Sequence, residues 1–332
     1  MALKGWLPLA AWREVRRRRF PKRILAAMML TGVVVGGVFG ILGLEFARTL
    51  PAGRKWIAWT LVYLGVAGIV VLQRLLRGQV IARVEQERDA EAAREIQTRL
   101  RPLVLPQPPG FELAGYYRSY QQVGGDYYDT LLLKDGRLLL TIADVSGKGV
   151  AAALLTANLQ AILKFADLDE RSLERVVSAI NVHLCRHTEA NRFITMLLGV
   201  LDLAGRRFTY VNAGHTPGFL ARRGKMIRLE ATAPPLGMIE EMRFPCSDTL
   251  LEPGDAMVFY TDGLSERSNP QGKFFEEEGI AAALERGGSG SAEAIVQRLV
   301  DDCEAFARGQ PADDDTAILV IRAKDSPAAG PA

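Results

Sequence analysis

Acidic residues lie at the ends of several short apolar runs of this chain, always beside small or turn-forming residues. Each run has the length and composition of a buried β-strand. A carboxylate at the end of such a strand is poorly placed for packing and well placed to offer oxygen ligands to a hard cation. One such residue would be ordinary turn chemistry, whereas several together indicate a metal site. They are Asp126 in 123–129, Asp144 at the end of 138–144, Asp262 in 257–263, and Asp313, Asp314 and Asp315 before 316–321.

The segment that carries these residues, 111–322, mixes strand and helix patterns. Runs of strands interspersed with paired helices favour an α+β layered domain over an alternating parallel sheet. Strands are predicted at 111–118, 131–133, 138–143, 194–203, 207–212, 218–221, 226–229, 256–261 and 316–322, and helices at 150–165, 172–187, 276–286 and 292–308.

Two uncharged stretches precede this domain. Residues 24–44 would form about 31 Å of helix, which matches a bilayer core of about 30 Å, and 56–72 is near the lower limit for a span. The short segment 45–55 between them predicts a transmembrane helical hairpin. The alternative is a cleaved signal peptide followed by a core helix, which the absence of an evident small-residue cleavage site disfavours.

Basic residues flank the hairpin and set its predicted orientation. The positive-inside rule places the N-terminus and everything after residue 73 in the cytoplasm, which predicts a multi-pass inner-membrane protein. The Arg16–Arg19 cluster suits contact with anionic inner-membrane lipid. A formal net charge of +3 gives no argument for a nucleic-acid partner.

A polar segment rich in Glu, Arg, Ala and Gln follows the hairpin and is predicted to be helical. Its thin apolar stripe includes Val84, Ile96 and Leu100, and it fits either a solvated stalk or a homodimer seam that carries a signal. Prolines then mark a domain boundary. The predicted organisation is a basic N-terminus (1–23), a hairpin (24–76), a linker (77–108), the layered domain (109–324) and a disordered tail (325–332).

The segment 138–155 has a rival interpretation as a dinucleotide-binding loop, because a strand, Gly147-Lys148-Gly149 and a helix follow one another. That motif also needs a second strand that ends in an acidic residue about 20 positions later. The intervening residues are predicted to be helical, and Asp144 would repel a pyrophosphate. Nucleotide binding is therefore disfavoured.

Six ordered motifs resemble those of one family, the SpoIIE-type bacterial serine/threonine phosphatases of the metal-dependent type 2C superfamily. The resemblance covers about residues 95–322, including Arg94-Glu95-Ile96-Gln97. The motifs are Gly124-Gly125-Asp126-Tyr127-Tyr128-Asp129, Asp144-Val145-Ser146-Gly147-Lys148-Gly149, Asn212-Ala213-Gly214-His215, Pro235-Leu236-Gly237, Pro253-Gly254-Asp255 with Tyr260-Thr261-Asp262-Gly263, and Asp313-Asp314-Asp315-Thr316.

The resemblance implies a β-sandwich flanked by helical layers, with two Mn²⁺ or Mg²⁺ ions held at one edge. Asp126 and Asp144 would bridge or flank the ions, Val145 would offer its backbone carbonyl, and Asp262 would bind the second ion. In the last motif Asp313 corresponds to the family's ligand, with Asp314 as the reserve because three consecutive aspartates leave the register open.

The chemistry of such a site can be stated from general principles. A phosphomonoester dianion repels hydroxide, and two cations about 3.5–4 Å apart lower the pKa of a bridging water and neutralise the phosphoryl oxygens. Four or five carboxylates are needed to offset the two ions. Gly124 and Gly125 would let the backbone approach them.

Other residues carry weaker hypotheses. Arg118 could bind the substrate phosphate or form a strand-face salt bridge. Asp129 is either a supporting group of the site or a turn residue. His215 could donate a proton or support a turn, with the turn role favoured. His183 and His187 have metal-like i, i+4 spacing but no third ligand nearby, so solvated or interface roles are favoured.

The expected function is that of a membrane-anchored phosphatase acting on phosphoserine or phosphothreonine of a cytoplasmic regulatory protein, as the resemblance implies for anti-sigma-factor antagonists. The alternatives are a catalytically inactive phosphoprotein-binding module and a membrane-tethered scaffold. The outer loop 45–55 is too short to fold into a ligand-binding domain, so a signal would arrive through lipid, a membrane partner or the cytoplasm.

Overall fold

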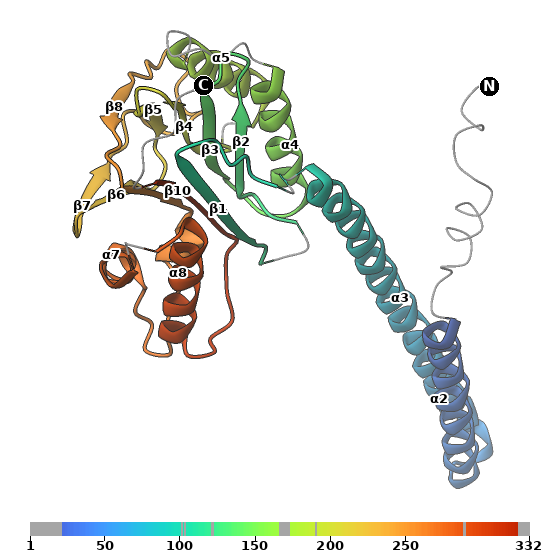
Figure 1. The fold of residues 1–332 in the computed structure, drawn as a ribbon. Coiled ribbons are helices and arrows are strands. Elements are labelled where there is room, and N and C mark those ends of the chain that lie inside the picture. The colour runs from blue at the N-terminus through green and yellow to red at the C-terminus, as the bar shows by residue number, and fades with distance from the viewer. Residues whose placement is uncertain are drawn as a thin grey trace, which may run out of the picture. The chain divides into compact units, whose positions relative to one another are not determined.

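The structure is a computed structural model that divides into two compact units, one ending at Glu87 and the other beginning at Arg88 (Figure 1). The described residues are 22–100, 102, 104–120, 123–165, 173–189, 191–287 and 290–324. The predicted tail 325–332 and most of the basic N-terminus lie outside them.

The first unit contains two helices joined by a short turn. Helix α2 (Lys22–Thr49) and the first part of α3 (Lys55–Leu100) are connected through a 3-10 turn, η1 (Ala52–Arg54). The helices pack closely where Gly43 faces Val62, because a Cβ on Gly43 would lie only 2.1 Å from a methyl carbon of Val62.

One helical stretch of the described residues, Ala52–Leu76, is long and apolar enough to cross a membrane. It contains the predicted second span, 56–72, and its large side chains, among them Tyr63 and Leu64, are exposed. The predicted first span, 24–44, lies within α2, where side chains are only partly described. That span therefore stays a prediction.

The second unit is a sandwich of two antiparallel five-stranded sheets. Sheet A has the order β1-β10-β9-β6-β7, with β1 (Phe111–Arg118), β10 (Thr316–Ala323), β9 (Ala256–Tyr260), β6 (Gly218–Arg222) and β7 (Lys225–Leu229). Sheet B has the order β2-β3-β4-β5-β8, with β2 (Tyr127–Leu132), β3 (Leu138–Val145), β4 (Ile194–Asp202), β5 (Arg207–Ala213) and β8 (Ser247–Leu250).

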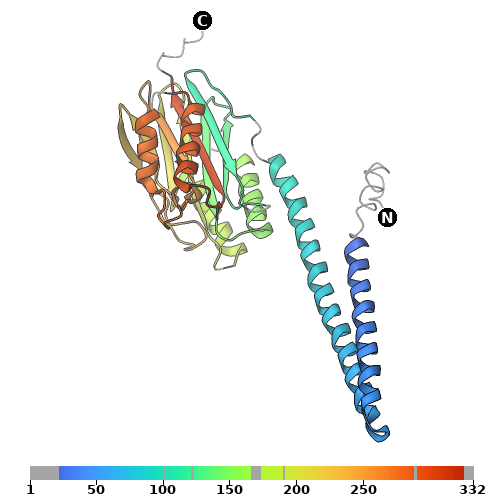
Figure 2. The ribbon, with the colours of Figure 1, turned by 90° about the horizontal axis from the view of Figure 1, so that it is seen from below.

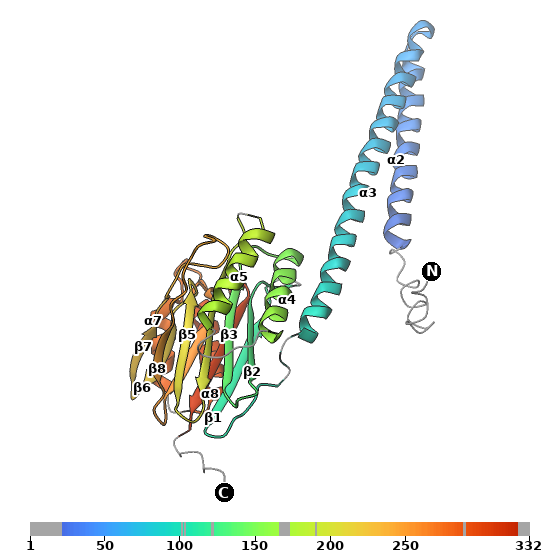
Figure 3. The same ribbon diagram turned by 90° about the horizontal axis from the view of Figure 1, so that it is seen from above.

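Helices cover the outer face of each sheet, which makes four layers (Figures 2 and 3). Helices α4 (Val150–Phe165) and α5 (Leu173–His187) pack on sheet B, and α7 (Glu276–Gly287) and α8 (Ala292–Ala307) pack on sheet A. A third apolar cluster fills the space between the sheets. The α+β sandwich with helical layers is thereby confirmed.

Several strands are buried on both faces, which explains why their sequences are continuously apolar. In β10, Ala317, Leu319 and Ile321 face the interior of the sandwich, whereas Ile318 and Val320 face the helices. The amphipathic helix α5 instead buries one face, formed by Leu173, Val177, Ile180, Asn181 and Leu184, at helical spacing. These patterns fix which face of each element is covered.

Some details differ from the sequence prediction. Strand β2 begins at Tyr127 rather than at residue 131, because Asp129 is buried within it and hydrogen-bonded. The short strand β8 and the one-turn helix α6 (Asp262–Ser265) were not predicted. Both are four residues long, too short to show a periodic pattern.

Candidate metal and phosphate site

The topology brings the predicted acidic residues to one edge of the sandwich. In sheet B, Tyr127 pairs with Ala143, which places Asp126 beside Asp144. In sheet A, β9 ends and antiparallel β10 begins at the same edge, so Asp262 and residues 313–315 lie together. The Thr261 hydroxyl donates a hydrogen bond to Asp126 Oδ2 at 2.6 Å, which links the two sheets at this edge.

Glycines let the backbone approach closely here. A Cβ on Gly125 would lie 2.6 Å from the carbonyl oxygen of Val145 and 3.4 Å from a carboxylate oxygen of Asp144. A Cβ on Gly263 would lie 1.7 Å from the carbonyl oxygen of Asp315. Any larger residue would therefore push these segments apart. The Val145 carbonyl oxygen thus lies close to Gly125, and its role as a ligand stays a prediction.

Asp315 has a supporting role that sequence reasoning did not assign. One of its carboxylate oxygens accepts the Gly125 N–H at 2.8 Å, and the other accepts the Tyr120 N–H at 2.8 Å and the Ser119 hydroxyl at 3.2 Å. The carboxylate thus ties two loops to the start of β10. The sequence signal was a third consecutive aspartate, but only the fold shows which of the three points inward.

Burial and mutual repulsion raise the pKa values of the clustered carboxyls. Burial and then the charge of Asp144 raise the pKa of Asp126 well above its usual range. Burial, followed by repulsion from Asp262, raises the pKa of Asp144 to about 7. Burial, followed by repulsion from Asp314, raises the pKa of Asp262 to about 6. These shifts indicate negative charges held together with too few counter-charges.

The structure distinguishes Asp313 from Asp314. Asp313 is exposed, and its backbone carbonyl accepts a hydrogen bond from the Lys148 ammonium at 2.9 Å. The Asp314 carboxylate forms an ion pair with Lys148 at 3.0 Å and raises the pKa values of Asp144 and Asp262. The geometry therefore favours Asp314 over the first choice from the sequence, Asp313. The ligand role of each stays a prediction.

Arg118 ends β1 at the same edge, opposite Thr316 of β10. Its guanidinium forms an ion pair with Glu304 of α8, and Arg267 lies 3.5 Å from the same carboxylate. This is the strand-face salt bridge that the sequence analysis weighed against phosphate binding. One carboxylate thus serves two guanidiniums, and the substrate role of Arg118 stays a prediction.

Other predicted polar residues have structural partners. Asp129 accepts hydrogen bonds from the Tyr127 hydroxyl at 3.0 Å and from the Gln160 amide at 3.3 Å. His215 is buried, its Nδ1 lies 2.9 Å from the Thr195 hydroxyl, and burial lowers its pKa to about 4. The rings of His183 and His187 stack with centroids 4.6 Å apart.

The end of α3 reaches this site within the second unit. The buried Gln97 amide donates to the Gly124 carbonyl at 2.7 Å and accepts the Gly124 N–H at 3.2 Å. The Leu100 carbonyl accepts a hydrogen bond from Gln160 of α4 at 2.6 Å. The helix thus holds the loop that carries Asp126.

The donor set fits hard divalent cations in its chemistry, because it consists of carboxylate and carbonyl oxygens that are buried (Asp126, Val145) or half-buried (Asp144, Asp262, Asp314). Among the described residues, only one of these four carboxylates forms an ion pair, namely Asp314 with Lys148. Asp126, Asp144 and Asp262 form none there, so several negative charges remain to be offset. No three His, Cys, Asp or Glu side chains in the described part of the chain lie close enough to hold one ion as they stand. The fit therefore rests on the type and burial of the donors.

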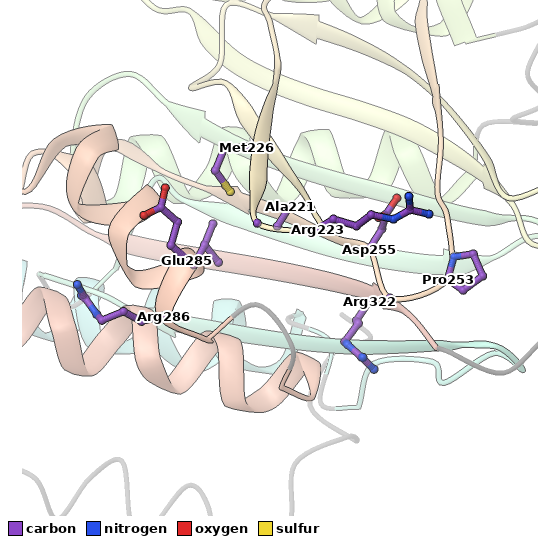
Figure 4. Close-up of a pocket in the computed structure, with 11 residues that line it drawn as sticks. Ala221, Arg223, Met226, Pro253, Asp255, Glu285, Arg286 and Arg322 are labelled. Carbon is purple, nitrogen blue, oxygen red and sulfur yellow. The ribbon is translucent and has the colours of Figure 1, made fainter.

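A cavity of about 450 Å³ lies at the opposite end of sheet A (Figure 4). It is bordered by the β6–β7 turn, residues 253–255, the end of α7 and Arg322. None of the predicted site residues lines it. The carboxylate edge, rather than this cavity, is the candidate functional site.

The fold and this edge define a class of protein, the PP2C-type phosphatases. The SiaA-PP2C domain of Pseudomonas aeruginosa has a TM-score of 0.64 at 19% identity, over 73% of this chain and 98% of that chain, which shows the fold. The RsbU and RsbW domains of a Mycobacterium tuberculosis protein have a TM-score of 0.58 at 29% identity, over 69% of this chain and 64% of that chain.

The family model for stage II sporulation protein E (SpoIIE) matches residues 134–324, more than half of the chain. The chain belongs to the SpoIIE family and carries its PP2C-type phosphatase domain. The phosphoserine phosphatase RsbU of Bacillus subtilis (strain 168) is 29% identical over 252 residues, which are 74% of this chain and 73% of RsbU.

Other relatives are matched over a smaller share of their length. Protein IcfG of Synechocystis sp. is 26% identical over 266 residues, which are 70% of this chain and 41% of IcfG. The phosphoserine phosphatase RsbP of Bacillus subtilis is 29% identical over 55% of this chain and 47% of RsbP. The chain thus spans less than half of these two relatives.

Proposed function

We propose that this chain is a metal-dependent protein phosphatase that hydrolyses phosphoserine or phosphothreonine on a cytoplasmic protein. The observation that carries the proposal is the convergence of Asp126, Asp144, Asp262 and Asp314 from four separate segments at one edge, with too few counter-charges. Membership of the SpoIIE family and similarity to two phosphoserine phosphatases support it.

Asp126, Asp144, Asp262, Asp314 and the Val145 carbonyl would hold two Mn²⁺ or Mg²⁺ ions. When bound, such ions neutralise the phosphoryl oxygens and supply an activated water for in-line attack. The protein's own groups position the donors: Thr261 fixes Asp126, and Asp315 fixes the Gly125 loop. Lys148 holds Asp314 at the rim.

The direct test is phosphate release by the full chain in detergent, from p-nitrophenyl phosphate and from a phosphoserine peptide. Release should require Mn²⁺, stop with chelator and be lost in Asp144→Asn. The matched control is Asp301→Asn, because Asp301 is exposed on α8, where it accepts a hydrogen bond from Gln297. Phosphopeptide binding without any release would instead support the inactive binding module.

The same proposal includes anchoring of the phosphatase at the inner membrane. The apolar stretch Ala52–Leu76 and the basic residues around the uncharged runs support a hairpin with both termini in the cytoplasm. Anionic lipid would contact the basic N-terminus. A phosphorylated anti-sigma-factor antagonist is the substrate class that the family resemblance implies. Loss of membrane association in a chain that begins at residue 77 would support the anchor, and unchanged association would contradict it.

We further propose that the linker homodimerises through α3 and so controls the site. The contacts of Gln97 with Gly124 and of Leu100 with Gln160 provide a route from the linker to the Asp126 loop and to α4. Exposed Ile96 and Leu100 are available for a partner helix. Deletion of residues 1–90 should reduce both dimerisation and activity, and if neither changed this part of the proposal would be wrong.

A further inference from the structure

A cationic side chain lies beside the carboxylate edge and is not used by the site described so far. The Ser146 N–H donates to the Phe193 carbonyl at 3.0 Å, and the Phe193 N–H donates to the Ser146 hydroxyl at 2.8 Å. These two bonds fix Arg192 and Phe193 against the loop that follows Asp144. A Cβ on Gly147 would lie 3.1 Å from a terminal nitrogen of Arg192, so the guanidinium lies over Gly147.

Of the three cations Arg118, Lys148 and Arg192 around this edge, Arg192 has the longest ion pair. Arg118 forms a close ion pair with Glu304, and Lys148 forms one with Asp314 at 3.0 Å. Arg192 lies 3.7 Å from Glu189, whose side chain is 77% exposed. Such a long, solvated pair contributes little, so Arg192 can exchange it for a stronger anion at small cost.

An exposed apolar ridge continues from Arg192. Its members are Phe193, Met238 and Ile239, with 37%, 58% and 53% of their surface exposed. The ridge is joined to β4 where Ile194 and Leu236 exchange backbone hydrogen bonds at 3.0 and 2.8 Å. A Cβ on Gly237 would lie 3.1 Å from the Arg192 carbonyl, so the backbone segment before Met238 lies against the segment that carries Phe193.

A buried amide holds the ridge in one conformation. Asn181, which is fully buried on α5, accepts the Gly237 N–H at 2.8 Å and donates to the Ile239 carbonyl at 2.8 Å. Singly exposed apolar residues are common, but three neighbouring exposed apolar residues on a fixed backbone beside the carboxylate edge are typical of a recognition surface. The exposed carboxylates of Glu240 and Glu241 next to it disfavour an anionic lipid surface as the occupant.

We propose that Arg192 and this ridge bind the phosphoserine segment of the protein substrate, an inference that rests on the proposed phosphatase function. The planar guanidinium would take two phosphoryl oxygens, which its fork geometry matches. Phe193, Met238 and Ile239 would take an apolar side chain next to the phosphoserine. Arg192 is thus the phosphate-binding arginine, in the role that the sequence analysis offered to Arg118.

The test compares three substrates of the full chain in detergent with Mn²⁺: p-nitrophenyl phosphate, a phosphoserine peptide with leucine neighbours, and the same peptide with serine neighbours. Arg192→Gln should raise KM for all three by about 10- to 100-fold, the range expected for charge-assisted hydrogen bonds, with kcat changed less. Arg192→Lys should restore part of the loss, and Arg118→Gln should not reproduce it.

Replacing both Met238 and Ile239 by serine should raise KM for the leucine peptide alone. The control is Arg186→Gln, because Arg186 pairs with Glu240 on the same face without reaching the carboxylate edge. If the wild type is active and KM is unchanged in Arg192→Gln, this inference is wrong while the proposed function stands.

If the wild type releases no phosphate, the proposed function fails, and binding of fluorescently labelled phosphopeptide then decides the inference separately. Binding weakened by Arg192→Gln supports the recognition surface. Equal binding by both proteins overturns it.

Discussion

The two ends of strand β9 each carry an aspartate, and the two carboxylates have opposite surroundings. Asp255, just before the strand, is buried but accepts hydrogen bonds from the Arg222 guanidinium at 2.7 and 2.9 Å and from the Glu252 N–H at 2.7 Å. Asp262, just after it, faces Asp314 and Asp144, and its pKa is raised to about 6 by burial and then by the charge of Asp314.

The difference separates a structural acid from a functional one. A buried carboxylate that accepts several hydrogen bonds on one oxygen, as Asp255 does, stabilises a turn, whereas one held among like charges costs stability. Proteins keep the second arrangement where a ligand or a reaction needs it. The comparison therefore predicts that the two aspartates will respond oppositely to the same substitution.

The largest expected effect is a loss of catalysis on substitution of Asp262, at the C-terminal end of β9. Asp262→Asn should reduce Mn²⁺-dependent phosphate release by about 10³-fold, because several kcal/mol of transition-state stabilisation depend on the bound ions. The free energy of unfolding without metal should stay equal or rise, since one repelling charge is removed. If Asp262→Asn kept its activity, Asp262 would not be needed for catalysis and this part of the comparison would be wrong.

The next effect is the stabilisation of the wild type by metal. Mn²⁺ at a hundredfold excess over its Kd should raise the free energy of unfolding by about 2.7 kcal/mol for each ion bound, because the ions bind the folded state only. Urea unfolding with and without chelator measures it. In Asp262→Asn the gain should shrink markedly, and an equal gain would show that the ion binds elsewhere.

At the N-terminal end of β9, Asp255→Asn should lower the free energy of unfolding by about 2 kcal/mol, since the partly buried Arg222 loses the nearer of its two counter-charges and keeps only Glu252 at 3.3 Å. Phosphate release at 25 °C should remain within about twofold of the wild type, because none of the proposed metal-binding residues lines the cavity at this end. Urea unfolding and the phosphate-release assay together measure this. A loss of activity with full stability would reverse the assignment of the two ends.

The smallest effect concerns His215, which is buried and forms no ion pair with the residues that the structure describes. Its folded pKa of about 4 lies below the unfolded value of 6.5, so the unfolded state binds the additional proton first. Stability contributed by neutral His215 is thus complete above pH 6.5 and declines as the pH falls toward 4. Between pH 7.5 and 5.5 the free energy of unfolding should drop by about 1 kcal/mol more in the wild type than in His215→Gln. Equal slopes in the two proteins would contradict this account.

Much of the fold was accessible from the sequence, because β3 and β10 are long apolar runs and α5 and α8 bury regular faces. The short elements β8 and α6 were not, since four residues carry no period. Their positions depend on tertiary partners, such as the pairing of Arg207 with Leu250.

The candidate site was predictable in its residue types and not in its details. The motifs located Asp126, Asp144 and Asp262, but the order of three consecutive aspartates gave no reason to prefer Asp314 at the charged cluster or Asp315 as the loop clamp. The partners of Asp315 and of Arg192 are far away in the chain, so only the folded backbone reveals them.

The pairing of β1 with β10 has a consequence for biogenesis. The ribosome makes β1 well before β10. Strand β1 therefore has no pairing partner at this position until everything between the two strands has been translated. The aspartates that precede β10 arrive at the same late moment. The charged edge therefore cannot form before β10 has been made, which delays any chemistry there until both sheets can pair.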